Sequence, residues 1–193
     1  MTTPANPNLL EVDWTKIPAP IDDGAAAHLQ GAHVPDVTLA ATDGPPVSLA
    51  KLGGCLVVFA YPRTGVPGKA PLVEDWDMIP GARGCTPQTC AFRDLHKELV
   101  DAGASRVFGL STQSSTDQKE AAERLHLPFA LLSDEQLALS RALPLPTMQL
   151  AGLTLTKRLA IVIDNGRVTK VFYPVFPPDR NATDVLTWLR ARR

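Results

Sequence analysis

The chain carries two closely spaced cysteines, Cys85 and Cys90, at the expected start of a helix. Thr86 is suited to the N-cap and Pro87 to the first helical position, because a proline nitrogen has no hydrogen to leave unpaired. Cys85 would then lie just before the helix, where free backbone N–H groups and the positive end of the helix dipole favour a thiolate over a thiol. Arg83 is placed to add a positive charge. These features predict a reactive cysteine.

The spacing of the two cysteines restricts their chemistry. On an ideal helix, residues five apart have Cα atoms roughly 8 to 9 Å apart, whereas a disulfide spans at most about 7 Å. If Cys85 and Cys90 bond to each other, the first turn of the helix therefore has to unwind. The C-x4-C spacing disfavours a disulfide exchanger, which uses C-x-x-C. It fits a pair in which a substrate oxidises one thiolate to sulfenic acid and the other cysteine resolves it.

Zinc binding is the competing interpretation of a cysteine pair. A structural zinc site needs four ligands with tight pairs such as C-x2-C. The remaining candidates are single histidines scattered along the chain, at positions 28, 33, 96 and 126. We therefore expect no metal. The third cysteine, Cys55, stands in an apolar strand and is expected to be a buried, inert thiol.

One arginine is a candidate partner for a thiolate. Arg158 stands at the start of a predicted strand, where an inward-facing guanidinium is costly unless it serves an anion. A thiolate is such an anion. An exposed arginine at the end of a strand is the alternative that spacing alone leaves open.

Composition and charge limit the class of protein. The chain has 193 residues, 45% of them hydrophobic, and a net charge of -1, which suits one globular core. We expect neither nucleic acid nor a membrane as partner, since no basic block and no apolar run of about 18 residues is present. The N-terminus lacks the pattern of a signal peptide. We therefore expect a cytoplasmic protein, whose three cysteines form no disulfide framework.

The elements that must position these residues follow in chain order. We expect an N-terminal extension over residues 1–32, anchored by Trp14, and a single domain over residues 33–193. Strands are predicted over residues 37–40, 47–49, 55–60, 105–110, 159–163 and 168–173. Helices are predicted over residues 87–102, 115–127 and 134–143 and from a cap at Asn181 or Thr183.

This order of elements predicts an α/β fold. A strand-helix-strand unit followed by a hairpin and a C-terminal helix builds a mixed central sheet flanked by helices on both faces, the thioredoxin-like arrangement. The hairpin is indicated by Asn165-Gly166, a pair that tolerates the positive φ angles of a type I′ turn. The long loop over residues 61–80 would then leave the carboxyl end of the central strand, where open sheets hold their sites.

Several segments resemble the peroxiredoxins, closest to the bacterioferritin-comigratory or Q-type branch, over roughly residues 31–190. Residues 85–94, CTPQTCAFRD, resemble the family's Cys-Thr-x-Glu-x-Cys-x-Phe-Arg-Asp block, with Gln88 at the usual glutamate. Residues 59–62 resemble its central strand ending in Tyr-Pro, and residues 34–49 resemble its opening strands.

The resemblance implies a thiol-dependent peroxidase that reduces hydrogen peroxide or organic hydroperoxides. Cys85 would be the peroxidatic cysteine, Cys90 the resolving cysteine in a Cys85–Cys90 disulfide, and Arg158 the active-site arginine. A thioredoxin-like or other dithiol reductant would reduce the disulfide, with no cofactor and no metal. The protein would be a monomer or a homodimer.

The loop before the cysteine departs from the family pattern. Peroxiredoxins place proline seven and threonine three residues before the peroxidatic cysteine, whereas this chain has Met78 and Ala82 there. Either Pro62 and Thr64 fold back to supply the usual contacts, or Pro80 and backbone amides rebuild the peroxide pocket.

Two other functions stay open. One is a non-enzymatic redox sensor, in which a Cys85–Cys90 disulfide unfolds the helix and alters a surface for a partner. The other is an enzyme on the same scaffold that binds an organic substrate with the inserted loop, residues 63–79. A peroxidase must turn over with a dithiol reductant, whereas a sensor need not.

Overall fold

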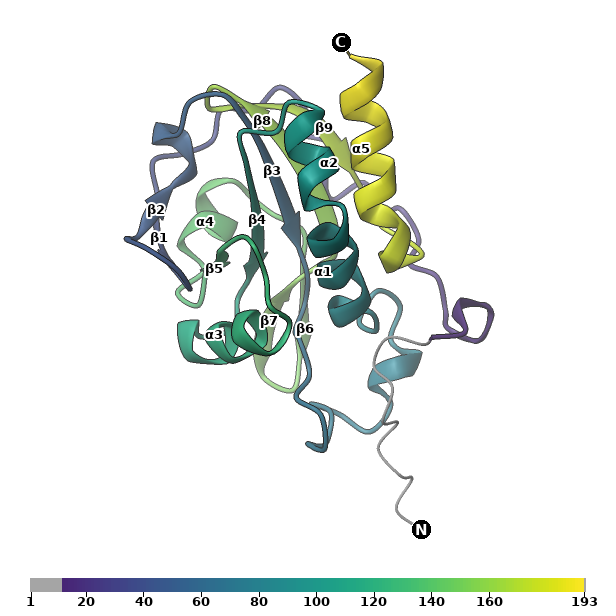
Figure 1. Ribbon diagram of the computed structural model, residues 1–193. Helices are drawn as coiled ribbons and strands as arrows, with labels where there is room; N and C mark the ends of the chain where they lie inside the picture. The colour runs from purple at the N-terminus through teal and green to yellow at the C-terminus, as the bar shows by residue number, and fades with distance from the viewer. Residues whose placement is uncertain (1–11, 193) are drawn as a thin grey trace.

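The computed structural model in Figure 1 describes residues 12–192, so the first eleven residues of the expected extension and Arg193 lie outside the described residues. Within that range the strands are β1 (Thr38–Ala41), β2 (Val47–Ser48), β3 (Cys55–Ala60), β4 (Arg106–Ser111), β5 (Leu131–Ser133), β6 (Thr147–Leu150), β7 (Leu153–Thr156), β8 (Leu159–Asp164) and β9 (Arg167–Phe172). The α-helices are α1 (Cys85–Asp94), α2 (His96–Asp101), α3 (Ser115–Arg124), α4 (Ala138–Ala142) and α5 (Asn181–Ala191). Short 3-10 turns are η1 (Trp14–Lys16), η2 (Leu49–Lys51), η3 (Trp76–Met78) and η4 (Pro178–Arg180).

The strands form a mixed sheet of seven strands in the order β2-β1-β5-β4-β3-β8-β9, with β6 and β7 as a separate hairpin. Strands β3, β4 and β5 run parallel to one another, whereas β8 is antiparallel to both β3 and β9. Every residue of β3 is buried, as expected of a strand covered on both faces. The predicted central strand is therefore confirmed.

Helices cover both faces of this sheet. Figure 1 shows α1, α2 and α5 side by side, and together with α3 they bury one face through side chains such as Phe92 and Val185. The other face is covered by α4 and by residues 26–34, which contribute Leu139 and Leu29 to a second core cluster. The mixed sheet with helices on both faces was thus correctly predicted, and the last part of the extension belongs to the core.

Two elements, β5 and the β6–β7 hairpin, were not predicted. Strand β5 is only three residues long and is held by β4 and β1, which are distant in sequence. The β6–β7 hairpin turns at Ala151 and Gly152, both with positive φ angles of 49° and 76°. Alanine rarely adopts this conformation and gives no turn signal in a sequence. The predicted Asn165-Gly166 turn has φ angles of 47° and 80°, which confirms the β8–β9 hairpin.

The helix boundaries differ from the prediction at four helices. The helix expected over residues 134–143 is α4, which begins only at Ala138. The single helix expected over residues 87–102 is α1 followed by α2, separated at Leu95, where ψ rises to 10°. Ser114 caps α3 by accepting a hydrogen bond from the Asp117 N–H. Asn181 is the first residue of α5 and follows η4 directly, so neither Asn181 nor Thr183 caps that helix.

Candidate active site

The position of Cys85 follows from the backbone of Gly84. Gly84 has a φ of 104°, in the left-handed region that residues with a side chain avoid. Gly84 is therefore the N-cap, Cys85 begins α1, and the prediction that Thr86 caps the helix is wrong. Pro87 is the third helical residue, where its missing N–H still costs no intrahelical hydrogen bond. Cys85 accordingly lies in the first turn, at the positive end of the helix dipole.

Arg158 points inward and lies against Cys85. Its Nη2 atom is 3.3 Å from the Cys85 Sγ atom, and both residues are buried, with 2% and 4% of their surfaces exposed. The other hydrogen-bond partners of Arg158 are neutral amide oxygens. A buried guanidinium needs an anionic partner to offset its loss of hydration. A thiolate at Cys85 is an anion within contact distance.

The same guanidinium fixes the end of the inserted loop. Nη2 of Arg158 donates to the carbonyl oxygens of three consecutive residues, Gly81, Ala82 and Arg83, at 3.2, 3.2 and 3.0 Å. These carbonyls immediately precede the N-cap of α1. Arg158 therefore holds both the sulfur and the backbone that leads to it.

Gln88 links the side chain of Arg158 to that of Asn181 through hydrogen bonds. Its Oε1 atom accepts a hydrogen bond from Arg158 Nη1 at 2.6 Å, and its Nε2 atom donates to Asn181 Oδ1 at 2.9 Å. All three side chains are buried. Because the amide of Gln88 is neutral, it orients Arg158 without neutralising the positive charge that faces Cys85.

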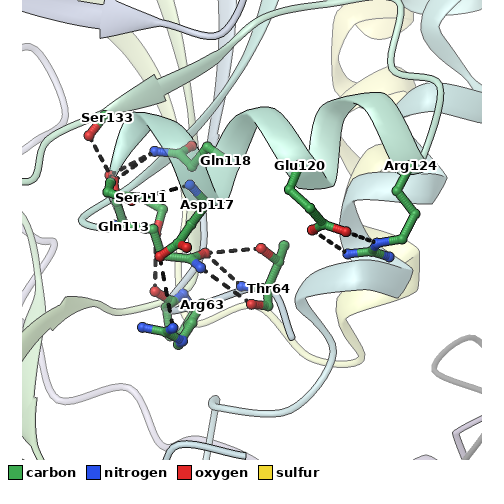
Figure 2. Close-up of polar contacts among 11 residues, drawn as sticks. Arg63, Thr64, Ser111, Gln113, Asp117, Gln118, Glu120, Arg124 and Ser133 are labelled. Carbon is green, nitrogen blue, oxygen red and sulfur yellow. Dashed lines mark hydrogen bonds and ion pairs between the residues drawn. The ribbon is translucent and has the colours of Figure 1, made fainter. Parts of the chain in front are cut away.

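Thr64 lies in a separate polar cluster with Ser111 and Gln113, shown in Figure 2, and Pro62 contacts the same cluster. Gln113 Oε1 accepts hydrogen bonds from the Thr64 N–H at 2.7 Å and from the Thr64 hydroxyl at 3.0 Å. The Ser111 hydroxyl donates to the Pro62 carbonyl at 3.1 Å. Among residues 12–192, no hydrogen bond joins Pro62 or Thr64 to Cys85. The structure thus brings Cys85 and Arg158 together and directs the Thr64 hydroxyl to Gln113.

A small cavity adjoins Arg158 on the side of the inserted loop. Its volume is about 120 Å³. Pro80 and Gly81 border it, and Arg158 and Lys157 supply its charged groups. The remaining lining residues are Pro20, Ile21, Met148, Tyr173 and Pro174. Pro80, the residue suggested as a replacement for the usual proline, therefore lines the same cavity as Arg158.

Tyr61 lies in the same buried core cluster as Cys85 and is hydrogen-bonded to Gln118, and neither residue was predicted to be part of the site. The Tyr61 hydroxyl donates to Gln118 Oε1 at 3.2 Å. Burial raises the pKa of the Tyr61 phenol, and the nearby charge of Cys85 raises it further, so the phenol stays neutral. Gln118 lies on the face of α3 that also buries Ala121. This position was the sequence signal for its role, because a large amide among inward-facing residues needs buried hydrogen-bond partners.

The other two cysteines are also buried and free. Burial raises the pKa of the Cys90 thiol, so it stays protonated while α1 is intact. Burial, and then the charge of Asp164, raises the pKa of the Cys55 thiol to about 11. The prediction that Cys55 is a buried, inert thiol of the central strand agrees with this environment.

The part of the chain that the structure describes has no helix long and apolar enough to cross a membrane. In the same residues, 12–192, no group of three or more histidine, cysteine, aspartate or glutamate side chains is placed to hold a metal ion.

Replacing Gly84 by alanine is expected to destabilise the protein by about 2 to 4 kcal/mol and to lower the reactivity of Cys85. A Cβ atom at Gly84 would lie 2.6 Å from Pro178 Cγ and 2.7 Å from Trp14 Cη2, and alanine would also be strained at the φ of this position. Urea unfolding of the native protein and of Gly84→Ala measures the change in the free energy of unfolding.

Gly44 provides the matched control for this substitution. It has a similar positive φ of 76°, but nothing lies within 4 Å of its Cβ position. Gly44→Ala is expected to cost only about 1 to 2 kcal/mol and to keep full activity. Equal losses of stability in the two variants would show that the close packing of Gly84 has no role.

A family model and several curated relatives match this chain over most of its length. The family model described as Redoxin matches residues 29–186. "Peroxiredoxin Q, chloroplastic" from Sedum lineare is 36% identical over 164 residues, covering 84% of this chain and 78% of that protein. The protein of the same name from Arabidopsis thaliana is 32% identical, with 84% and 67% covered.

Solved structures show the same likeness. Peroxidoxin BcpB from Mycobacterium tuberculosis superimposes with a TM-score of 0.68 at 31% identity, covering 85% of this chain and 97% of that one. Peroxiredoxin Q from Xanthomonas campestris gives a TM-score of 0.65 at 24% identity, covering 82% and 92%, which establishes a shared fold.

Proposed function

The chain belongs to the peroxiredoxin family, in its Q-type branch with a thioredoxin-like fold, and we propose that Cys85 is its peroxidatic cysteine and Cys90 its resolving cysteine. Family membership makes the protein a thiol-dependent peroxidase, with a hydroperoxide as substrate and a thioredoxin-type reductant. The observation that carries the assignment to Cys85 is the contact of 3.3 Å between its Sγ atom and Arg158 Nη2.

The first step is attack of the Cys85 thiolate on the distal oxygen of the hydroperoxide. The sulfur takes up OH and becomes sulfenic acid, the O–O bond breaks, and the remaining alkoxide takes a proton to leave as water or an alcohol. The guanidinium of Arg158 is placed to stabilise the thiolate and the charge that develops on the leaving oxygen. The free N–H groups at the start of α1 add to this stabilisation.

In the second step the Cys90 thiol condenses with the sulfenic acid. The Cys85–Cys90 disulfide forms and one water leaves, after which a dithiol reductant restores both thiols. Both cysteines lie within the continuous helix α1, so its first turn has to unwind before the sulfurs meet. Unwinding also takes Cys90 out of the buried environment that raises the pKa of its thiol.

Pro80 and Gly81 are proposed to border the approach of the hydroperoxide to Arg158, since both line the adjoining cavity. Catalytic roles for Pro62 and Thr64 stay predictions. Their contacts to Ser111 and Gln113 support a role in anchoring the start of the inserted loop. The names of the plant relatives place those proteins in chloroplasts, and a cytoplasmic location for this chain likewise stays a prediction.

The Cys90→Ser variant tests the proposed division of roles. After one equivalent of hydrogen peroxide, mass spectrometry of the native protein should show the loss of two hydrogens and a peptide pair joined through Cys85 and Cys90. The variant should instead gain one oxygen on Cys85, as a sulfenic acid that dimedone traps. Turnover with a thioredoxin-type reductant should fall by about tenfold or more, because no internal thiol resolves the sulfenic acid. A bond to Cys55, or oxidation of Cys90 in place of Cys85, would contradict the assignment.

A further inference from the structure

Trp14 lies directly against the backbone that begins the catalytic helix. A Cβ atom added to Gly84 would be 2.7 Å from Trp14 Cη2 and 2.6 Å from Pro178 Cγ, distances too short for any real side chain. The edge of the indole ring therefore contacts Gly84, the residue immediately before Cys85. Gly84 is therefore packed against both Trp14 and Pro178.

The indole is held by a part of the chain that does not belong to α1. Its Nε1–H donates to Asp179 Oδ2 at 2.9 Å. Its ring meets the ring of Phe176 edge to face, with centroids 6.0 Å apart and planes at 78°. These two contacts hold Trp14 against the segment that leads into α5. The indole and this segment together pack against the first turn of α1.

Disulfide formation requires this turn to move. The Cα atoms of Cys85 and Cys90 are roughly 8 to 9 Å apart on a regular helix and must approach to about 7 Å or less. The backbone of Gly84 and Cys85 then leaves its place against Trp14 and Pro178. A contact that exists only while the turn is folded favours the folded turn, and its loss is part of the free-energy cost of unwinding.

We propose that Trp14 is a positioning residue that keeps the first turn of α1 folded and thereby slows the condensation of Cys85 sulfenic acid with Cys90. This proposal rests on the Cys85–Cys90 disulfide of the proposed function. While the turn is folded, Cys85 stays beside Arg158, so the contact prolongs the state that reacts with hydroperoxide and delays the state that closes the disulfide.

Two reactions compete for the sulfenic acid. Condensation with the Cys90 thiol gives the disulfide and one water, whereas a second hydroperoxide molecule adds one oxygen to give sulfinic acid and releases water or an alcohol. The second reaction inactivates the enzyme. Slower unwinding therefore means greater sensitivity to inactivation at high hydroperoxide concentration.

Trp14→Ala tests the proposal through this competition. We expect the disulfide to form about tenfold faster in stopped-flow and quenched mass-spectrometric measurements, a factor that corresponds to about 1.4 kcal/mol. The hydroperoxide concentration that inactivates half of the enzyme should rise by the same factor of about ten. The rate constant for the initial oxidation of Cys85 should stay within about twofold, since the folded turn remains the major state. A general loss of stability would lower activity and would not produce resistance to inactivation.

Two further variants serve as controls. Trp14→Phe keeps an aromatic ring beside Phe176 and loses the hydrogen bond to Asp179, so it should give an intermediate rate. Lys16→Ala changes an exposed residue of the same 3-10 turn and should behave as the native protein.

The indole itself can report the movement. The chain has three tryptophans, so replacing Trp76 and Trp188 by phenylalanine leaves Trp14 as the single indole fluorophore. Its emission should change with the same rate constant as disulfide formation.

The outcomes separate the two proposals. A disulfide that forms in Trp14→Ala at the native rate or more slowly would overturn the role of Trp14 alone. So would a disulfide that forms in the single-tryptophan protein without a change in Trp14 emission. If no Cys85–Cys90 bond forms in the native protein, the resolving role of Cys90 fails, and the role of Trp14 fails with it.

Discussion

Replacing Cys85 by serine is expected to reduce peroxidase turnover to the uncatalysed level, a loss of about 10⁴-fold or more. A serine hydroxyl is not ionised at neutral pH and does not attack an O–O bond, so Arg158 would have no anion to stabilise. The measurement is the peroxide-driven consumption of dithiothreitol or of a thioredoxin-type reductant. Serine is nearly isosteric with cysteine, and the Gly84 turn and the contacts of Arg158 with residues 81–83 do not depend on the sulfur.

Cys55→Ala is the matched control for this experiment. Cys55 is also buried, but it lies in β3, and burial raises the pKa of its thiol to about 11. We expect turnover within about twofold of the native protein and a loss of stability of about 1 kcal/mol from the lost packing. Undiminished turnover in Cys85→Ser, or loss of turnover in Cys55→Ala, would show that a different thiol reacts with the hydroperoxide.

Much of the fold follows from local patterns in the sequence. The buried run of β3 and the Asn165-Gly166 turn carry signals within a few residues, and both were placed correctly. Strand β5 and the β6–β7 hairpin were missed for opposite reasons. Strand β5 depends on pairing with distant strands, whereas the hairpin turns at Ala151, a residue type that normally avoids a positive φ.

In the candidate site, too, features set by neighbouring residues could be predicted, whereas features set by tertiary packing could not. The position of Cys85 at the start of a helix could be inferred from residues next to it, because a helix N-terminus is a local feature. The partners of Pro62 and Thr64 could not, because the inserted loop begins at a polar cluster built by Ser111 and Gln113 at the end of β4. The contact between Trp14 and Gly84 likewise joins segments that only tertiary packing brings together.

Arg158→Met is expected to slow the oxidation of Cys85 by about 10² to 10³-fold, the range found when one preorganised donor at a developing charge is removed. Methionine fills a similar volume without charge, so the thiolate loses its cationic neighbour at 3.3 Å. Stopped-flow measurement of the second-order rate constant with hydrogen peroxide checks this step separately from resolution. Because residues 81–83 and Gln88 would also lose a hydrogen-bond donor, thermal unfolding of the variant must be measured alongside.

Arg158→Lys separates the charge from the geometry of the guanidinium. An ammonium group keeps the positive charge but offers no planar fork that reaches Gln88, the loop carbonyls and the sulfur together. We expect a rate constant between those of the native protein and Arg158→Met. If lysine restored the full rate, the charge alone would activate Cys85. If both variants oxidised Cys85 at the native rate while staying folded, the contact between Arg158 and the sulfur would have no catalytic role, and the free N–H groups of α1 would have to stabilise the thiolate alone.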